Sequence, residues 1–175
     1  MGIVVDAISG GDIAGVVKNN IDTPLDLSGK SCQEFFDGVR VLAGSAKITV
    51  LRIWSHGATH YADKYETPYN KGNIHLGRDQ IDADTIGKYE DHLKILTPLL
   101  EEYGWVELRG CQAALGSGAK MMLRMAEIWK RDVHGSDRSQ PLMTWTPPVK
   151  AAKPGLSTLV GANFVEYNDQ RFRRR

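Results

Sequence analysis

The feature that most constrains the fold is a run of seven residues, 48–54 (ITVLRIW), in which only Thr49 and Arg52 are not apolar. A run that is apolar on nearly both faces is typical of a central strand in a parallel sheet that helices cover. Two other short apolar runs, residues 2–8 (GIVVDAI) and 105–108 (WVEL), predict further strands of the same sheet.

Segments with helical periodicity alternate with these strands. Ser31 and Glu34 have the spacing of a capping box, which predicts the start of a helix. Residues 86–103 repeat apolar side chains at a helical period, and Pro98 inside them predicts a kink or two shorter pieces. Another amphipathic helix is expected after Ser117. Alternation of this kind predicts an α/β fold, a three-layer α/β/α sandwich around a mainly parallel central sheet.

Three polar segments lack a strong period. Residues 11–30 are rich in Gly, Asn and Asp, and we expect mostly loop there. Residues 55–80 predict a long excursion with one short strand at 73–76. Residues 137–155 contain four prolines and predict an exposed connection.

The composition is that of a globular protein: 42% of the 175 residues are hydrophobic and 25% are charged. This length predicts one domain, residues 1–170, followed by a basic tail at 171–175. The net charge is +1, and four arginines at the end contribute +4, which leaves −3 on the remainder. A body with this charge makes nucleic acid an unlikely partner.

The sequence also indicates a compartment. It contains no apolar run near the ~20 residues that span a bilayer. The first residues lack the basic region of a signal peptide. Two cysteines, Cys32 and Cys111, are too few for a disulfide framework. We therefore expect a cytoplasmic protein with no membrane span.

Two strand ends carry residues that could perform chemistry. Residues 48–54 run into His56 and Gly57, and the strand that begins at residue 105 runs towards Cys111. Carboxyl ends of parallel strands share one edge of a sheet, so the imidazole and the thiol could meet there. An imidazole activates a thiol as a nucleophile, and backbone N–H groups at Gly57 and Cys111 could bind an oxyanion. The alternatives are a buried structural cysteine and a histidine that is merely hydrogen-bonded.

These blocks, ITVLRIWSHG at 48–57 and VELRGC at 106–111, resemble the caspase-like superfamily of cysteine peptidases. That superfamily includes caspases, metacaspases, clostripain-like enzymes, separases and self-processing domains of bacterial toxins. The order, histidine before cysteine, and the separation of 55 residues match, since the caspase separation is about 50. The residues around Cys111 differ from the caspase motif, so the likeness is to divergent bacterial members.

The resemblance implies a cysteine endopeptidase that cuts a protein or peptide substrate at selected sites. Cys111 would be the nucleophile, His56 the general base and acid, and Gly57 an oxyanion donor. The reaction would need no cofactor, although calcium or an anionic activator regulates some superfamily members. A regulatory or inhibitory protein partner is also expected. The alternative is a catalytically inactive interaction module on the same fold.

The resemblance also implies a substrate pocket at Arg109, two residues before the nucleophile. A guanidinium there would favour an acidic substrate residue. The alternative is that Arg109 pairs with Glu107 or Asp137 and touches no substrate.

Three other patterns predict structure rather than chemistry. Cys32 lies beside two phenylalanines in the first turn of an expected helix, which favours a core position. His56 and His60 have a spacing that suits zinc only on a helix, so no metal site is predicted. The methionines that follow Ser117 are expected to pack into the core.

Overall fold

A seven-stranded sheet forms the centre of the computed structural model, which describes residues 2–57, 72–140 and 149–162. Its strands are ordered β2-β1-β3-β6-β7-β8-β9. The pairs from β2 to β7 are parallel, and β8 and β9 are antiparallel to their neighbours. The bounds are β1 Ile3–Ile8, β2 Leu25–Asp26, β3 Ile48–Trp54, β6 Leu100–Arg109, β7 Asp132–Ser136, β8 Val149–Ala152 and β9 Val160–Gly161. The predicted α/β class and mainly parallel sheet are confirmed.

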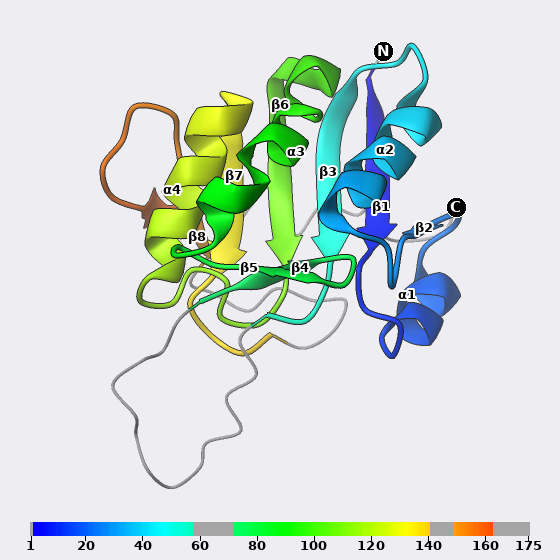
Figure 1. The fold of residues 1–175 in the computed structure, drawn as a ribbon, viewed down its shortest axis with the longest axis horizontal. Helices are drawn as coiled ribbons and strands as arrows, with labels where there is room; N and C mark the ends of the chain where they lie inside the picture. The colour runs from blue at the N-terminus through cyan, green and yellow to red at the C-terminus, as the bar shows by residue number, and fades with distance from the viewer. Residues whose placement is uncertain (1, 58–71, 141–148, 163–175) are drawn as a thin grey trace, which may run out of the picture.

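Three helices cover one face of this sheet (Figure 1). They are α2 (Cys32–Ala43), α3 (Glu90–Lys94) and α4 (Gly118–Trp129), and two short 3₁₀ helices, Ile86–Tyr89 and Thr97–Leu99, flank α3. The methionine stripe of α4 is fully buried against the sheet, as predicted, and so is Cys32. None of the helices in the described ranges is long and apolar enough to cross a membrane.

The two faces of the sheet carry different side chains because side chains alternate along a strand. On β3, Leu51 and Ile53 belong to the main apolar core, whereas Arg52 and Trp54 alternate with them on the other face. Helix α1 (Ala14–Asn20) packs with Ile8 and Trp54 in a second, smaller apolar cluster. Outside α1 and the two residues of β2, residues 11–30 form turns and loops, as predicted, but the helix itself was not predicted.

The helix predicted at Ser31 is confirmed together with its capping box. The Glu34 N–H donates to the Ser31 hydroxyl (3.3 Å), and the Ser31 N–H donates to the Glu34 carboxylate (2.8 Å). This reciprocal pair gives hydrogen-bond acceptors to two backbone N–H groups that would otherwise lack partners at the start of the helix.

The interpretation of residues 86–103 was wrong at its end. The helical pieces stop at Leu99, and Leu100 already pairs with Ile48 in the sheet. The helical segment is divided into shorter pieces, as predicted, and Pro98 lies in the first turn of the last piece. Pairing with β3 then draws the following residues into β6 although their spacing suits a helix. The expected connection over residues 137–155 likewise contains β8.

The carboxyl ends of β1, β3, β6 and β7 all point to one edge of the sheet, and the small hairpin of β4 (Ile74–Leu76) and β5 (Asp79–Ile81) lies across it (Figure 1). The predicted short strand at 73–76 is therefore confirmed. Ser9, just after β1, fixes this hairpin: its hydroxyl donates to the His75 carbonyl (2.7 Å) and accepts from the Gly77 N–H (2.6 Å). The hairpin thus closes one side of the edge where the candidate residues lie.

Candidate functional site

His56 and Cys111 occupy equivalent positions at the carboxyl edge of the sheet. The last paired residues of β3 and β6 are Trp54 and Arg109, which are partners in the parallel register. His56 and Cys111 each come two residues after that pair. The register therefore brings the two predicted catalytic residues onto neighbouring chain segments.

The backbone of Gly57 lies directly against the backbone of Cys111. A Cβ atom on Gly57 would stand 1.7 Å from the Cys111 carbonyl oxygen and 2.9 Å from its amide nitrogen. No side chain fits such a gap, so this position requires glycine for close approach rather than for an unusual dihedral angle. The two segments predicted to supply the oxyanion donors are in contact.

The β4 hairpin holds the segment that contains His56. The His75 N–H donates to the His56 carbonyl (3.3 Å), and Gly57 forms an isolated antiparallel bridge with Ile74. Burial lowers the pKa of His75, and the neighbouring His56 lowers it further. A second imidazole therefore lies near His56, and a positive charge on His56 disfavours a positive charge on His75.

The His56 imidazole has a carboxylate partner that the sequence analysis did not identify. Its Nε2 lies 2.7 and 2.8 Å from the two carboxylate oxygens of Asp12, which belongs to the loop between β1 and α1. This hydrogen bond lowers the pKa of Asp12. The signal that could have revealed Asp12 is its place just after the first strand, at the same sheet edge.

The Cys111 thiol is partly exposed and contacts the backbone of Gln140. The Gln140 N–H donates to Sγ (3.3 Å), and Sγ lies 3.5 Å from the Gln140 carbonyl oxygen. The Gln140 side chain is anchored in turn on the Ser136 hydroxyl (2.6 Å). A backbone N–H aimed at sulfur stabilises a thiolate. Cys32, in contrast, is fully buried, and burial raises its pKa to about 12.

The turn that follows the thiol is held in an uncommon conformation. Gln112 has a φ of 55°, in the left-handed region that side chains other than glycine and asparagine rarely adopt. Its N–H donates to the Arg138 carbonyl (2.9 Å), and the Ala114 N–H donates to the Ser136 carbonyl (2.9 Å). These bonds tie the Cys111 turn to the last residue of β7 and to the segment that follows it. A strained backbone conformation of this kind is frequent at functional sites.

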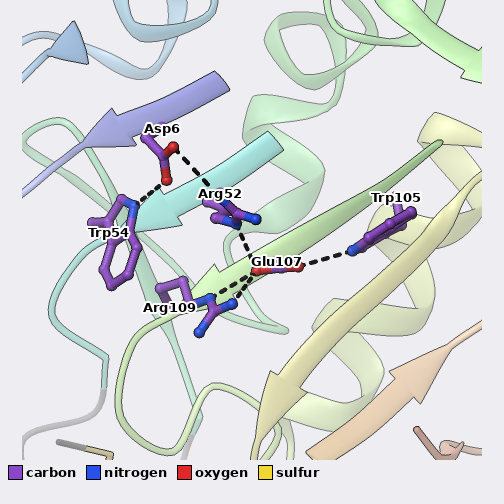
Figure 2. A network of polar contacts seen from close by, with 6 residues as sticks. All are labelled: Asp6, Arg52, Trp54, Trp105, Glu107 and Arg109. Atoms are coloured by element: carbon purple, nitrogen blue, oxygen red, sulfur yellow. Dashed lines mark hydrogen bonds and ion pairs between the residues drawn. The ribbon is translucent and has the colours of Figure 1, made fainter. Parts of the chain in front are cut away.

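Arg109 belongs to a buried polar network on the face of the sheet opposite the main core (Figure 2). Its guanidinium donates to the Glu107 carboxylate at 2.8 and 2.5 Å and lies over the Trp54 ring. The network continues across β3 and β1 through contacts of Arg52 with Glu107 and of Arg52 with Asp6. The pairing of Arg109 with Glu107 is one of the alternatives to a substrate pocket that the sequence left open. The role of Arg109 in a substrate pocket stays a prediction.

The charges of this network support one another. Burial raises the pKa of Glu107, but Arg109 and Arg52 beside it outweigh that effect and hold the pKa below its usual range. The Trp105 indole N–H adds a third donor to the same carboxylate (2.9 Å). Glu107 is therefore the ionised centre of the network.

His134 on β7 lies next to this network, and its ring faces Trp105 at 6.4 Å. Burial lowers the pKa of His134 to about 4 from an ordinary 6.5, so the folded protein keeps this imidazole neutral. The unfolded chain takes up the proton below pH 6.5, and the free energy of unfolding therefore falls as the pH drops towards 4.

We expect His134 to account for about 2 kcal/mol of stability lost between pH 7 and pH 5. Urea unfolding at both pH values, on wild type and His134→Phe, measures this. The variant retains an aromatic ring and should lose that part of the pH dependence. An equal loss in both proteins would contradict the assignment.

The structure thus brings together His56, Gly57 and Cys111, and it adds Asp12 and Gln140 to them. No group of three or more metal-ligating side chains occurs among the described residues. His60 lies outside the described ranges, as does the basic tail at 171–175.

Fold and site together define the class: an α/β domain with a thiol and an imidazole on adjacent strand ends of a mainly parallel sheet. The chain belongs to the family described as Domain of unknown function (DUF4347), whose model matches residues 34–140, more than half of its length. The matched span includes His56, Gly57, Arg109 and Cys111 and excludes Asp12. No curated protein matches the chain, and no solved structure does.

Proposed function

We propose that this protein is a cysteine endopeptidase in which His56 and Cys111 act as a dyad on a protein or peptide substrate. The observation that carries the proposal is the contact between the Gly57 and Cys111 backbones at matched offsets beyond paired strands. That contact places an imidazole-bearing segment beside a thiol-bearing one at the edge where α/β proteins bind ligands.

The proposed reaction has two stages. His56 takes the proton of the Cys111 thiol, and sulfur attacks the substrate carbonyl carbon. The oxyanion that forms accepts hydrogen bonds from the Gly57 and Cys111 N–H groups. His56 returns the proton to the leaving amine as the C–N bond breaks. Water then attacks the thioester, giving the free acid and restoring the thiol.

The proposal extends to architecture and location. The fold would be a three-layer α/β/α caspase-like sandwich, with α2, α3 and α4 as one outer layer and α1 as part of the other. Two free cysteines suit the reducing cytoplasm. A regulatory protein partner remains part of the proposal inherited from the caspase-like resemblance.

Thiol labelling tests the dyad directly. We expect iodoacetamide to modify Cys111 at least ~100-fold faster than Cys32, because Cys32 is fully buried and has a raised pKa. Burial of Cys32 alone explains part of that ratio, so the decisive comparison is between the rates of Cys111 labelling in wild type and in a His56 variant. His56→Ala should slow Cys111 labelling by about tenfold, and His92→Ala, away from this edge, should leave it unchanged.

Cleavage of a peptide library completes the test. Wild type should cut at selected positions, and Cys111→Ala should reduce cutting by about 10³-fold or more. Cleavage after Asp or Glu would support the pocket role of Arg109, and cleavage after Arg or Lys would reject it. Labelling of Cys111 that is independent of His56, together with no cleavage, would overturn the peptidase proposal.

The second candidate is a catalytically inactive interaction module. The contact of both Gln140 backbone groups with the Cys111 sulfur favours it, because a thiol engaged by the protein's own backbone is less open to a substrate. An inactive module would leave Cys111 slow to label in wild type and His56→Ala alike.

A further inference from the structure

Asp12 is the charged partner of the imidazole in the candidate dyad. Its loop is shaped for this contact: a Cβ on Gly10 would lie 3.3 Å from His56 Cδ2 and 3.4 Å from an Asp12 carboxylate oxygen. A side chain at position 10 would crowd both groups. The loop therefore brings a carboxylate to the imidazole from the end of β1, one strand away from His56.

The contact fixes which edge of the ring is engaged. Nε2 meets the Asp12 carboxylate, and the adjacent Cδ2 lies beside Gly10, so the Nε2–Cδ2 edge faces the loop after β1. The opposite edge, which carries Nδ1, faces away from that loop. In the sheet, β3 stands between β1 and β6, so the Cys111 segment lies on that other side.

We propose that Asp12 is a positioning residue that keeps the proton of neutral His56 on Nε2 and leaves Nδ1 to exchange the proton of the Cys111 thiol. A carboxylate only accepts hydrogen bonds, so Nε2 must donate to it. When His56 becomes imidazolium during the reaction, the same carboxylate stabilises the positive charge. The inference rests on the proposed function for its catalytic meaning.

His75 is a second neighbour of His56, and unlike Asp12 it has no negative charge that could stabilise an imidazolium. His75, on β4, is half-buried, and burial and the neighbouring His56 both lower its pKa. Asp12 is therefore the residue on this side that balances an imidazolium. Because 71% of its side chain is exposed, solvent screens the pair, and its effect will be smaller than that of a buried triad carboxylate.

Two measurements on the full chain test this role. In ¹⁵N spectra of histidine-labelled protein, neutral His56 of wild type should carry its proton on Nε2 alone. Asp12→Ala should give a measurable fraction of the Nδ1–H form, and Asp12→Asn, whose amide can accept or donate, should fall between them. In peptide cleavage, Asp12→Ala should lower kcat about tenfold with little change in KM.

Asp22→Ala is the matched control, since Asp22 is an exposed aspartate just beyond the same helix α1. It should leave both the His56 spectrum and kcat at wild-type values. An unchanged His56 spectrum in Asp12→Ala would overturn the positioning role, whatever the activity. A wild type that cleaves no peptide while the spectrum shifts as expected would sink the peptidase proposal and leave the Asp12–His56 assignment standing.

Discussion

Replacing Gly57 with alanine is expected to destabilise the protein by about 3 kcal/mol and to abolish peptide cleavage. The added Cβ would stand 1.7 Å from the Cys111 carbonyl oxygen, a backbone atom that no rotamer change can move. The segments after β3 and β6 would have to separate, which displaces His56 from Cys111. Urea unfolding at pH 7 and peptide cleavage by the purified variant measure the two effects.

A second glycine provides the control for this substitution. Gly15, inside α1, has no atom within 4 Å of an added Cβ, so Gly15→Ala should stabilise the protein by up to about 1 kcal/mol. Cleavage should not change. A Gly57→Ala protein as stable and active as wild type would show that the two strand ends do not meet as closely as the structure indicates.

Glu107→Gln is expected to cost about 3 kcal/mol of folding free energy. The amide keeps the shape of the side chain but removes the negative charge that faces Arg109 and Arg52 inside the protein. Both buried guanidinium groups then lose their shared counter-ion, although Arg52 keeps its contact with Asp6, and removing one member of a buried ion pair is strongly unfavourable. Urea unfolding followed by tryptophan fluorescence measures the loss.

The pH dependence of the same network has a defined sign. Since the pKa of Glu107 is lowered in the folded state, its stabilising contribution is present above about pH 4.5 and is lost as the pH falls below that value. Glu107→Gln should lack that acid-dependent step. Glu90→Gln removes a solvent-exposed ion pair with Arg124 and should change stability little, because water and salt screen it. Equal losses in the two variants would contradict a special role for the buried network.

Much of the fold could be predicted because its signals are local. The apolar run that became β3 and the capping box at Ser31 depend on neighbouring residues only. The helix predicted over residues 100–103 was wrong because the interaction that decides their structure is not local. Their spacing suits a helix, yet pairing of Leu100 with Ile48 makes them part of β6. The short helix α1 was missed because seven residues among glycines and polar side chains carry little periodic signal.

The candidate site likewise contains residues that the sequence could propose and residues that only the folded structure assigns. His56 and Cys111 could be proposed from the sequence because each follows an apolar strand. Asp12 and Gln140 were not assigned to them. The place of Asp12 after the first strand is a weak signal for this edge, but which side chain each of the two residues contacts is fixed only by folding. The pairing of Arg109 with Glu107 was one of the alternatives that the sequence left open, and it forms because the two side chains lie two residues apart on the same face of β6.

The sequence by itself determined the α/β class, the main strands and helices, and the two strand ends that carry an imidazole and a thiol. Only the tertiary structure decided that these ends touch through Gly57, that a carboxylate from the first loop holds the imidazole, and that a network of charged side chains shares the second face of the sheet with a small apolar cluster. The reason is physical: periodicity and capping act between residues a few positions apart, whereas the register of parallel strands and the pairing of buried charges depend on segments that only folding brings together.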